Sequence, residues 1–349
     1  MSNTDKKQKV FVAMSGGVDS SVAALLLKEK GYDVTGVHML CWEGCENNED
    51  KRDAMRVAAK LGIPFLVWDF KKEYREEVFD YMVRGYAESR TPNPDVMCNK
   101  EIKFGIFLKR ALEAGADFIA TGHYVRHLEA ELPSGSSASK LFAAKDPSKD
   151  QSYFLWALTQ NQLRHCLFPI GDYLKSEVRE LARKAGLPTA AKKDSQGLCF
   201  VGKVDFQEFL RRILPRKEGA ILNPAGEEIG KHDGAHFYTI GQRHGLKLGG
   251  LERPAYVAER DANANTLVVA DAENPALYLN EIKIGEINLI SGNPPERMEV
   301  RVRYRQPRQG ARFSGGKIIF DSPQRGVAQG QSAVFYSGEE LLGGGVIKA

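Results

Sequence analysis

The feature that most constrains the fold of this chain is a short apolar run followed by a glycine-rich loop and a helical pattern. The apolar run covers Val10–Met14, and the loop Ser15–Ser21 reads Ser-Gly-Gly-Val-Asp-Ser-Ser. Glycine lets the backbone approach a ligand closely, and the amides that begin a helix attract an anion. The lysine of the common phosphate loop G-x-x-x-x-G-K-[ST] is missing. The stretch therefore predicts a nucleotide-binding loop that works without this lysine.

The first 125 residues alternate strand and helix patterns. Apolar runs predict strands at Val10–Met14, Asp33–Met39, Pro64–Asp69 and Asp117–Thr121. Periodic segments between them predict helices at Ser20–Lys30, Asp50–Leu61, Lys72–Ser89 and Lys103–Ala114. This alternation predicts an α/β fold with a doubly wound parallel sheet, in which ligands bind beyond the carboxyl ends of the strands.

The pattern changes after this region. Residues 129–150 contain a Ser- and Gly-rich segment that predicts a hairpin or loop, and helical patterns return at Tyr153–Leu158 and Lys175–Ala185. After a short helix near Phe206–Leu214, the helix signal fades into short strands separated by Gly, Pro and Asn. Such spacing predicts small β modules or a barrel.

Length and composition set broad limits. The 349 residues suffice for two or three domains, and the net charge of +4 is modest. No stretch approaches the ~20 apolar residues that span a membrane, and the first residues lack the apolar core of a signal peptide. We therefore expect a cytoplasmic enzyme with no membrane partner. Its five cysteines are expected to be structural, catalytic or metal-binding rather than a disulfide scaffold.

Two cysteines lie in polar, Gly- and Pro-rich stretches. Cys98 follows Pro94 and Asp95, and we expect it on an accessible site just ahead of a helix that begins near Asn99–Lys103. A thiol at a helix N-terminus with lysines nearby has more thiolate at neutral pH. Cys199 lies in a glycine-flanked loop behind two lysines, which also favours an accessible thiolate.

The other three cysteines carry less information. Cys166 is expected to be a buried, unreactive thiol. Cys41 and Cys45 form a C-x-x-x-C pair, but no partner pair of Cys or His follows closely in sequence. A redox pair or two ordinary thiols is favoured over a metal site, so no metal ligand is assigned.

The motifs taken together resemble one family. The loop, N-P-D-x-x-C at 93–98 and G-x-C-F-V-G at 197–202 are similar to those of the tRNA-specific 2-thiouridylases, the MnmA family of PP-loop ATP pyrophosphatases. Further similar stretches are Ala120–Arg126, Lys149–Leu155, Tyr238–Leu246, Val302–Pro307 and Gly330–Tyr336. The resemblance implies a PP-loop domain at 1–205, a small central β-rich domain at 206–278 and a C-terminal β-barrel at 279–349.

The resemblance also implies an activity. Such enzymes use ATP, and we expect Mg²⁺ with it, to replace the C2 oxygen of the wobble uridine of tRNA by sulfur. The residues that the resemblance assigns to ATP are Ala13, Met14, Ser15, Gly16, Gly17, Val18, Asp19, Ser20, Met39 and Gly122. Those that it assigns to tRNA are Asn93, Pro94, Asp95, His123, Lys149, Asp150, Gln151, Arg303, Tyr304 and Gln331. Cys98 would be the nucleophile, and Cys199 would carry a persulfide received from a sulfur-donor protein.

The chemistry of the residues agrees with this implication. A carbonyl oxygen is a poor leaving group, and its adenylation makes AMP the leaving group that sulfur then displaces. Cys98 either releases hydrosulfide from Cys199 or attacks the inner sulfur of its persulfide, which leaves a transient disulfide. Asp95 is a candidate acid or base, or a group that orients the uracil edge. The segment around Cys41–Asn48 is shorter than in the family and leaves the role of its thiols open.

The run Glu299–Arg312 is the main basic stretch. Alternation predicts that Arg301, Arg303 and Arg305 lie on one face of a strand, where like charges favour an anionic partner such as RNA phosphate, and Tyr304 is a candidate for base stacking.

Three alternatives remain open from sequence. The first is another PP-loop ligase or tRNA-modifying enzyme, and the second is a non-catalytic nucleotide- or tRNA-binding module. The third is a thiolation enzyme with an iron–sulfur cluster on Cys98 and Cys199, with or without Asp95 as a further ligand. The tRNAs used, the sulfur donor and the oligomeric state are also open.

Overall fold

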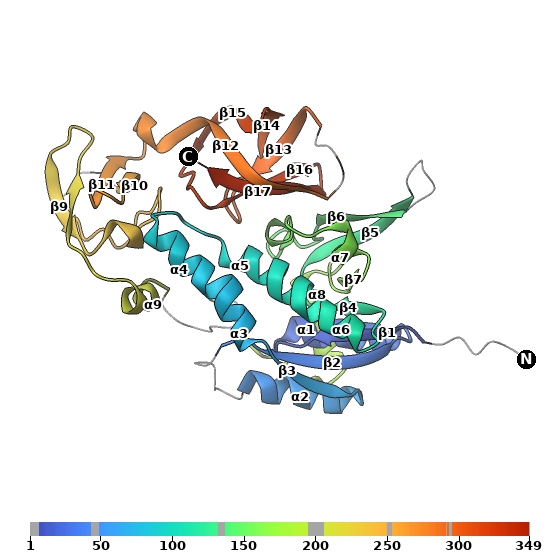
Figure 1. Cartoon of the computed structure of the whole chain (residues 1–349). Helices are drawn as coiled ribbons and strands as arrows, with labels where there is room; N and C mark the ends of the chain where they lie inside the picture. Colours follow the sequence, from blue (N-terminus) through green and yellow to red (C-terminus); the bar gives the residue numbers. More distant parts are fainter. Residues whose placement is uncertain are drawn as a thin grey trace, which may run out of the picture.

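The computed structural model describes residues 7–42, 49–131, 137–194, 206–249, 253–290, 292 and 295–348. Figure 1 shows three parts: a sheet with helices that holds the N-terminal half, a small β-rich part drawn in yellow and light orange, and a barrel drawn in orange and red. The helices α4, α5 and α6 lie between the sheet and the barrel in this view.

The N-terminal part is built on a five-stranded parallel sheet with the strand order β3-β2-β1-β4-β7. Its strands are β1 (Lys9–Ala13), β2 (Asp33–Leu40), β3 (Phe65–Asp69), β4 (Phe118–Ala120) and β7 (Cys166–Leu167). The chain builds the sheet outward from β1 in one direction and then returns to add β4 and β7 on the other side of β1. This confirms the predicted doubly wound fold, and it makes the edge beyond β1 and β4 the switch point where ligands bind.

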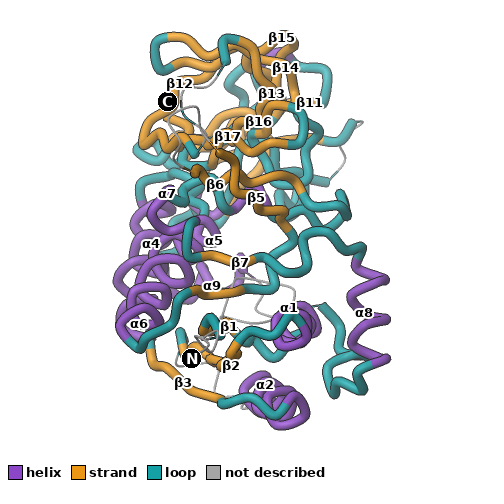
Figure 2. The backbone as a smooth tube through the Cα atoms, turned by 90° about the vertical axis from the view of Figure 1, so that its right-hand side faces the viewer, coloured by secondary structure: helices purple, strands orange, loops and turns teal. Residues whose placement is uncertain are grey.

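Helices cover both faces of this sheet, as Figure 2 shows. One face carries α1 (Val18–Glu29), α2 (Glu49–Leu61) and α8 (Lys175–Lys184). The other carries α3 (Lys71–Tyr74), the π-helical η1 (Arg75–Phe79), α4 (Asp80–Ala87), α5 (Pro94–Met97), the π-helical η2 (Cys98–Ile106) and α6 (Phe107–Glu113). Alternate residues of β1 enter the two cores, with Val10 and Val12 on the α1 side and Phe11 and Ala13 on the α6 side. Burial on both faces explains why the central strand β1 is apolar from Val10 to Ala13.

The predicted helix at Tyr153–Leu158 is wrong. Only a 3-10 turn, η3 (Ser152–Phe154), forms there, and the short helix α7 (Gln160–Leu163) follows. The backbone carbonyls of Trp156 and Leu158 accept hydrogen bonds from Asn288 Nδ2, at 2.7 and 2.9 Å. These carbonyls therefore bond to the barrel rather than along a helix.

The central part is β-rich, as expected. It contains α9 (Phe206–Ile213), the 3-10 turn η4 (Ala235–Phe237) and a four-stranded sheet of order β10-β11-β8-β9. The strands are β8 (Gly219–Leu222), β9 (Glu228–His232), β10 (Ala255–Asp261) and β11 (Thr266–Asp271). Its core also takes in Met82 and Tyr86 of α4, so this part packs on the helices of the N-terminal part.

The C-terminal part is a closed barrel, which confirms the prediction. After the turn η5 (Pro275–Leu277) come β12 (Tyr278–Leu289), β13 (Arg297–Arg301), β14 (Gln309–Ser314), β15 (Lys317–Arg325), β16 (Ser332–Ser337) and β17 (Glu340–Lys348). The ring runs β12-β15-β14-β13-β16-β17, and pairing of β12 with β17 closes it.

A hairpin from the N-terminal part extends the barrel's sheet. The hairpin consists of β5 (Val125–Glu131) and β6 (Ser137–Ala143), and β6 pairs with β17 through Phe142 beside Glu340. Barrel residues such as Tyr336 and Leu341 also share one apolar core with the helices α5 to α6 and the sheet. The barrel is therefore packed firmly on the N-terminal part.

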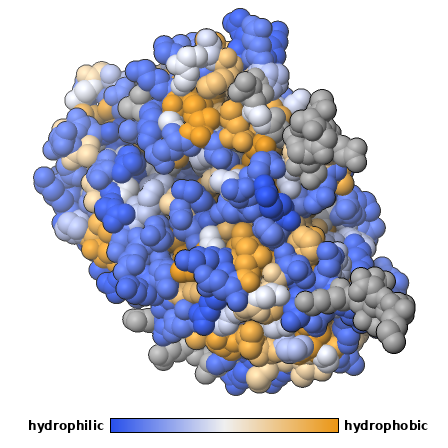
Figure 3. Space-filling model, turned by 45° about the vertical axis from the view of Figure 1, so that its right-hand side comes forward, coloured by the Kyte–Doolittle hydropathy of each residue, from blue (hydrophilic) through white to orange (hydrophobic). Residues whose placement is uncertain are grey.

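The surface shown in Figure 3 is mostly hydrophilic, with apolar residues in several separate patches. None of the helices in the described ranges is both long and apolar enough to cross a membrane.

Candidate functional site

The glycine-rich loop joins β1 to α1 at the carboxyl edge of the sheet. Gly16 has a φ of +80°, which favours glycine, and a Cβ at this position would lie 2.2 Å from the backbone oxygen of Asp50. A side chain is thus excluded twice at Gly16, by backbone conformation and by the close approach of α2. Both constraints explain why the sequence pattern has glycine at this position.

Serine hydroxyls form hydrogen bonds with the backbone of the loop and hold its conformation. Ser20 Oγ accepts a hydrogen bond from Ser15 N at 3.2 Å, and Ser21 Oγ donates to Gly17 O at 2.7 Å. The first turn of α1 has no acceptors within its own helix for the amides of residues 18–20. The loop therefore has the form of a cradle that presents helix N-terminal amides to an anion, which fits the phosphates of a nucleotide.

Gly122, just after β4, closes the cradle from the neighbouring strand. A Cβ on Gly122 would lie 2.6 Å from Ser20 N, so the backbone of Gly122 lies directly against the start of α1. Met39 lies near the carboxyl end of β2 and is buried in the core on the α6 side. The structure thus brings Gly122 to the residues predicted at Ala13–Ser20 and places Met39 at the same edge of the sheet.

An ion-pair network adjoins the loop, and the sequence did not indicate it. Lys175 Nζ donates to both carboxylate oxygens of Asp19, at 2.6 and 2.8 Å, and lies 2.9 Å from Asp194 Oδ1. Asp194 also pairs with Lys149 at 2.6 Å and with Arg179 at 2.7 Å. Burial opposes ionisation of Asp194, but hydrogen bonds from Lys149 and Lys175 outweigh it and lower its pKa to about 2. The one sequence signal for such a cation is the missing lysine of the loop, which is consistent with a cation supplied by another segment of the chain.

Asp19 is also held by a tyrosine. Tyr124 Oη donates to Asp19 Oδ1 at 2.8 Å, and burial followed by the charge of Asp19 raises the pKa of Tyr124. With Lys175 on both of its oxygens, Asp19 is a fully engaged carboxylate. The described residues contain no group of three or more His, Cys, Asp or Glu side chains placed to hold a metal.

Cys199 and Cys45 lie outside the described residues. The chain that leads toward Cys199 is anchored up to residue 194. Lys192 Nζ lies 2.6 Å from the carboxylates of Asp50 and Asp53 on α2, and Asp194 belongs to the network beside the loop. Asp194, the last described residue before Cys199, therefore lies beside the candidate ATP site.

The structure corrects the environment of Cys98. The helix begins at Pro94 rather than near Asn99, and Asn93 caps it by accepting a hydrogen bond from Val96 N at 3.3 Å. Cys98 therefore lies one turn inside a helical segment, at the start of η2, and its exposed fraction is 0%. Its polar neighbours in sequence had predicted exposure, but the helix turns the thiol into the core. Cys166 is buried as predicted, and burial raises the pKa of its thiol.

His123 is enclosed as well. Its ring packs between Phe104 and Phe168, with centroid distances of 5.7 and 6.4 Å, and Nδ1 forms a hydrogen bond with Thr121 Oγ1 at 2.8 Å. Burial, and then the charge of Lys103, lower the pKa of His123 well below its usual value. The ring is therefore neutral at physiological pH.

The turn Lys149–Gln151 is an ordered connection rather than a solvated loop. Asp150 is 5% exposed, and its Oδ1 accepts hydrogen bonds from the amides of Ala144 and Ser152. Its Oδ2 lies 3.4 Å from Arg301 of the barrel. Gln151 Oε1 accepts a hydrogen bond at 2.9 Å from the backbone N of Tyr124, the residue whose hydroxyl contacts Asp19.

The predicted row of arginines on one strand face is wrong. Strand β13 ends at Arg301, and the chain turns over residues 302–305, where Arg305 has a φ of +66°. Arg301 faces Asp150, while Arg303 donates to Ile240 O of the central part. Arg305 lies over the ring of Tyr304, 5.3 Å from its centroid.

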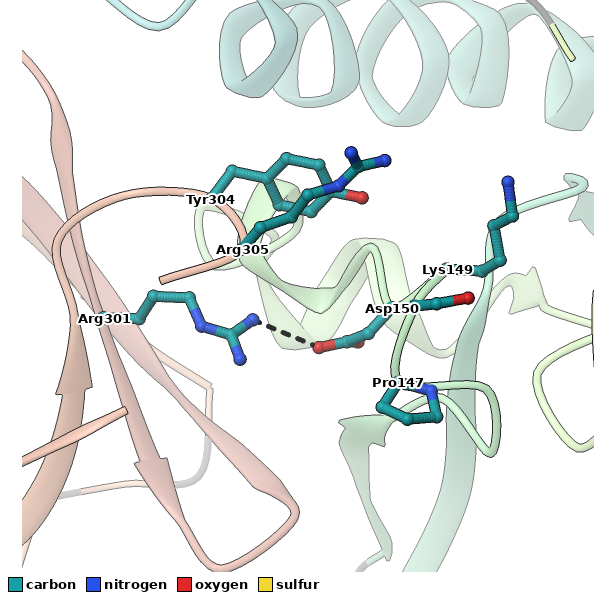
Figure 4. Close-up of a pocket in the computed structure, with 7 residues that line it drawn as sticks. Pro147, Lys149, Asp150, Arg301, Tyr304 and Arg305 are labelled. Atoms are coloured by element: carbon teal, nitrogen blue, oxygen red, sulfur yellow. Dashed lines mark hydrogen bonds and ion pairs between the residues drawn. The ribbon is translucent and has the colours of Figure 1, made fainter. Parts of the chain in front are cut away.

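This turn and the turn around Lys149 line one open cavity of about 500 Å³, drawn in Figure 4. The lining residues are Pro147, Ser148, Lys149, Asp150, Arg301, Tyr304 and Arg305. Figure 4 shows Arg305 beside the Tyr304 ring, the Arg301–Asp150 pair below them, and Lys149 on the right. Three cations against one carboxylate, with a half-buried aromatic ring, suit an anionic and aromatic ligand such as a nucleotide.

The barrel also holds the segment that leads to Cys98. Gln331 Nε2 donates to the carbonyls of Thr91 and Pro92, at 3.0 and 3.2 Å, and Thr91 N donates to Gln329 O at 2.7 Å. Of the residues predicted for tRNA, Gln331 thus adjoins Asn93 and Pro94, whereas Tyr304, Lys149 and Asp150 gather at the cavity.

Comparisons with known proteins agree with this arrangement. Family models match residues 8–203 (tRNA methyl transferase HUP domain), 207–271 (tRNA methyl transferase PRC-barrel domain) and 279–347 (Aminomethyltransferase beta-barrel domain). Over 362 residues the chain is 48% identical to tRNA-specific 2-thiouridylase MnmA 2 of Geobacillus kaustophilus, which covers 99% of this chain and 96% of that protein. It is 45% identical over 358 residues to MnmA of Marinobacter nauticus, with 97% and 91% covered.

Among solved structures, the U34-tRNA thiolase NcsA of Methanococcus maripaludis is a distant likeness, 21% identical with a TM-score of 0.37 over 60% of this chain and 66% of that one. The two relatives, in contrast, match along nearly the whole chain, and the PP-loop domain, central domain and barrel follow one another in the order of the family models. The chain therefore belongs to the MnmA family of tRNA-specific 2-thiouridylases.

Proposed function

We propose that this protein is an ATP-dependent tRNA sulfurtransferase that replaces the C2 oxygen of the wobble uridine by sulfur. The observation that carries the proposal is the 48% identity to a tRNA-specific 2-thiouridylase over 99% of the chain. The geometry supports it, because a phosphate cradle lies at the switch point of the sheet and a cationic cavity lies between the sheet's domain and the barrel.

The first step is adenylation of the base. The C2 oxygen of the uridine attacks the α-phosphorus of ATP, a P–O bond to the β-phosphate breaks, and pyrophosphate leaves. The residues assigned to ATP are those of the cradle, Ala13–Ser20, together with Met39 and Gly122. Amides at the start of α1 stabilise the negative charge on the phosphates. Mg²⁺ accompanies the phosphates, which would supply most of its ligands, since Asp19 is already engaged.

The second step is sulfur transfer. Cys199 carries a persulfide received from a donor protein, and its terminal sulfur attacks C2 while AMP leaves. Cys98 thiolate then attacks the inner sulfur, so that the S–S bond breaks, the thiouridine is released and a Cys98–Cys199 disulfide forms. In the other route Cys98 attacks first and releases hydrosulfide, which attacks C2. Both routes need an external thiol to reduce the disulfide. Asp95 is the proposed acid or base, or the group that orients the uracil.

Cys98 must move for either route. Its side chain is fully buried in this structure, packed in the core between sheet and helices. The segment that would move is the helical turn Pro94–Met97, which is held by the Asn93 cap and by Gln331 through the preceding residues. We infer that binding of tRNA at Asn93, Pro94 and Gln331 is coupled to exposure of this thiol.

The tRNA would occupy the side of the molecule that carries the cavity. Lys149, Arg303 and Tyr304 are proposed to contact it, with Asp150 and Gln151 fixing the turn that presents Lys149. His123 is proposed to support the tRNA-binding surface from the core beneath it, as a buried and neutral ring. We propose domain limits of 1–205, 206–278 and 279–349, with the barrel as the main tRNA-binding domain.

The test is to incubate the protein with ATP, Mg²⁺, a persulfide donor and unmodified tRNA, and to measure 2-thiouridine and pyrophosphate. We expect both products, and pyrophosphate only when tRNA is present. Absence of pyrophosphate would contradict the proposal and favour a non-catalytic module. Full thiolation by Cys199→Ser would rule out the persulfide role. Anaerobic purification that yields iron, with activity dependent on it, would replace the mechanism by a cluster-based one.

A further inference from the structure

The ammonium that pairs with Asp19 beside the phosphate cradle comes from a residue 156 positions further along the chain. Lys175 is the first residue of α8, and its side chain is 12% exposed. Its ammonium lies within 2.8 Å of both carboxylate oxygens of Asp19, and it lies 5.6 Å from the centre of the Tyr124 ring. Asp19 belongs to the first turn of α1, whose amides form the cradle. The ammonium is thus fixed beside the start of that helix.

This position is electrostatically unusual. The start of a helix carries partial positive charge, so a lysine placed there is unfavourable unless an anion compensates. Asp19 and Asp194 compensate here, but three cations, Lys149, Lys175 and Arg179, face these two carboxylates. A third carboxylate, Asp146, accepts a hydrogen bond from Lys175 N at 3.0 Å, so the formal charges of the cluster balance. The Lys175 ammonium nevertheless lies beside helix N-terminal amides that already favour an anion. A phosphate group would satisfy both.

We propose that Lys175 is the phosphate-binding lysine of this enzyme and takes the part of the lysine that the loop lacks. When the triphosphate occupies the cradle, the Lys175 ammonium exchanges one of its contacts with Asp19 for a phosphate oxygen, and Asp194 keeps the ammonium in place. The exchange neutralises charge on the departing pyrophosphate. This inference rests on the proposed use of ATP, and it assigns a residue outside the loop to the same site.

Binding measurements on the full-length protein without tRNA test this directly. Lys175→Met should weaken the binding of ATP and of pyrophosphate roughly 10- to 100-fold, the effect of losing one hydrogen bond to a charged group. Adenosine, which has no phosphate, should bind as to the wild type. Lys175→Arg should recover much of the ATP affinity because it keeps the charge. Lys184→Met is the matched control, since Lys184 lies on the same helix but is 72% exposed and pairs only with Glu180 among its described ion-pair partners.

The double variant Lys175→Met/Asp194→Asn covers the case in which the single variant folds poorly. It removes one cation and one carboxylate, so the charge of the network is unchanged. Thermal unfolding without ligand verifies that it is folded, and the same selective loss of ATP and pyrophosphate binding is expected. Unchanged ATP affinity, or an equal loss for adenosine and ATP, would overturn the assignment, because a merely structural lysine would show one of these two results.

The two proposals fail in different ways. If the wild type releases no pyrophosphate with tRNA, the proposed function is wrong whatever Lys175 does. If the wild type releases pyrophosphate and Lys175→Met binds and uses ATP normally, only the assignment of Lys175 is wrong.

Discussion

His123 illustrates how packing decides what a single residue can do. In sequence it follows a strand end, where an exposed and titrating histidine would be an ordinary expectation. In the structure its ring is 7% exposed, lies between two phenylalanines and bonds to Thr121 Oγ1. Burial lowers its pKa well below the usual 6.5. The imidazole is therefore a neutral packing and hydrogen-bonding group, and it cannot provide positive charge to RNA.

The lowered pKa of His123 predicts a pH-dependent stability. In the unfolded chain this histidine takes up a proton below about pH 6.5, whereas in the folded protein it stays neutral. The free energy of unfolding of the protein therefore decreases as the pH falls below about 6.5. His123→Phe, which suits the neighbouring Phe104 and Phe168, should lose less stability than the wild type between pH 7.5 and 5. Urea unfolding at both pH values measures this, and equal losses in the two proteins would contradict it.

At the scale of elements, the sequence contains a signal for the start of the helix before Cys98 at Asn93 and Pro94, and this signal was not part of the prediction. Asn followed by Pro is a strong signal for a capping residue and a first helical residue. The structure uses Asn93 and Pro94 in this way. From sequence we expect the helix to start near Asn99–Lys103 and Cys98 to be accessible, because the surrounding residues are polar and rich in Gly and Pro. Both expectations are wrong, since the helix starts at Pro94 and Cys98 is buried. The Asn93–Pro94 start therefore places Cys98, the proposed nucleophile, inside the helix and in the core.

The cap predicts a separation of stability from activity at Asn93. Asn93→Ala should lower the free energy of unfolding by about 1 kcal/mol because Val96 N loses its acceptor. Asn93→Ser keeps a capping oxygen and should retain most of that stability. If Asn93 also contacts the target base, the serine variant should still lose thiolation. Denaturant unfolding and the 2-thiouridine assay together measure both effects, and a serine variant with full activity would leave Asn93 with a capping role alone.

Other elements depend on contacts that sequence periodicity does not contain. The alternation at residues 300–305 is strand-like, yet the strand stops at Arg301 because the following turn packs Tyr304 on Phe154, with ring centroids 4.5 Å apart. Likewise the apolar pattern of Tyr153–Leu158 was read as a helix, but its carbonyls bond to Asn288. In both cases a partner more than a hundred residues away overrides the local pattern.

At the scale of the whole molecule, the alternation of strands and helices predicted the sheet, and the loop pattern predicted which of its edges carries the site. The pairs that join distant segments could not be predicted, because one sequence does not show which charges meet. Asp19 with Lys175 and Asp150 with Arg301 are such pairs. They link the cradle to α8, and the sheet's domain to the barrel.

The pair of buried Asp150 with partly buried Arg301 predicts how strongly these two domains are joined. Asp150→Asn should cost about 2 kcal/mol of unfolding free energy, because a partly buried guanidinium loses its charged partner. The matched control is Asp321→Asn, which breaks the exposed Arg297–Asp321 pair within the barrel and should cost less than about 1 kcal/mol. Thermal or denaturant unfolding of both variants checks this. Equal costs would mean that the Asp150 pair does not contribute to the joining of the domains.

The pairing of β6 with β17 has a consequence for how the protein is made. Phe142 lies beside Glu340, so this edge of the hairpin has no partner until about 200 more residues have left the ribosome. At usual translation speeds of about 5–20 residues per second, the edge waits roughly 10–40 s. During that time the nascent chain exposes a strand edge able to pair with other chains. The enzyme's biogenesis therefore includes an interval in which a chaperone that shields this edge would raise the yield of folded protein.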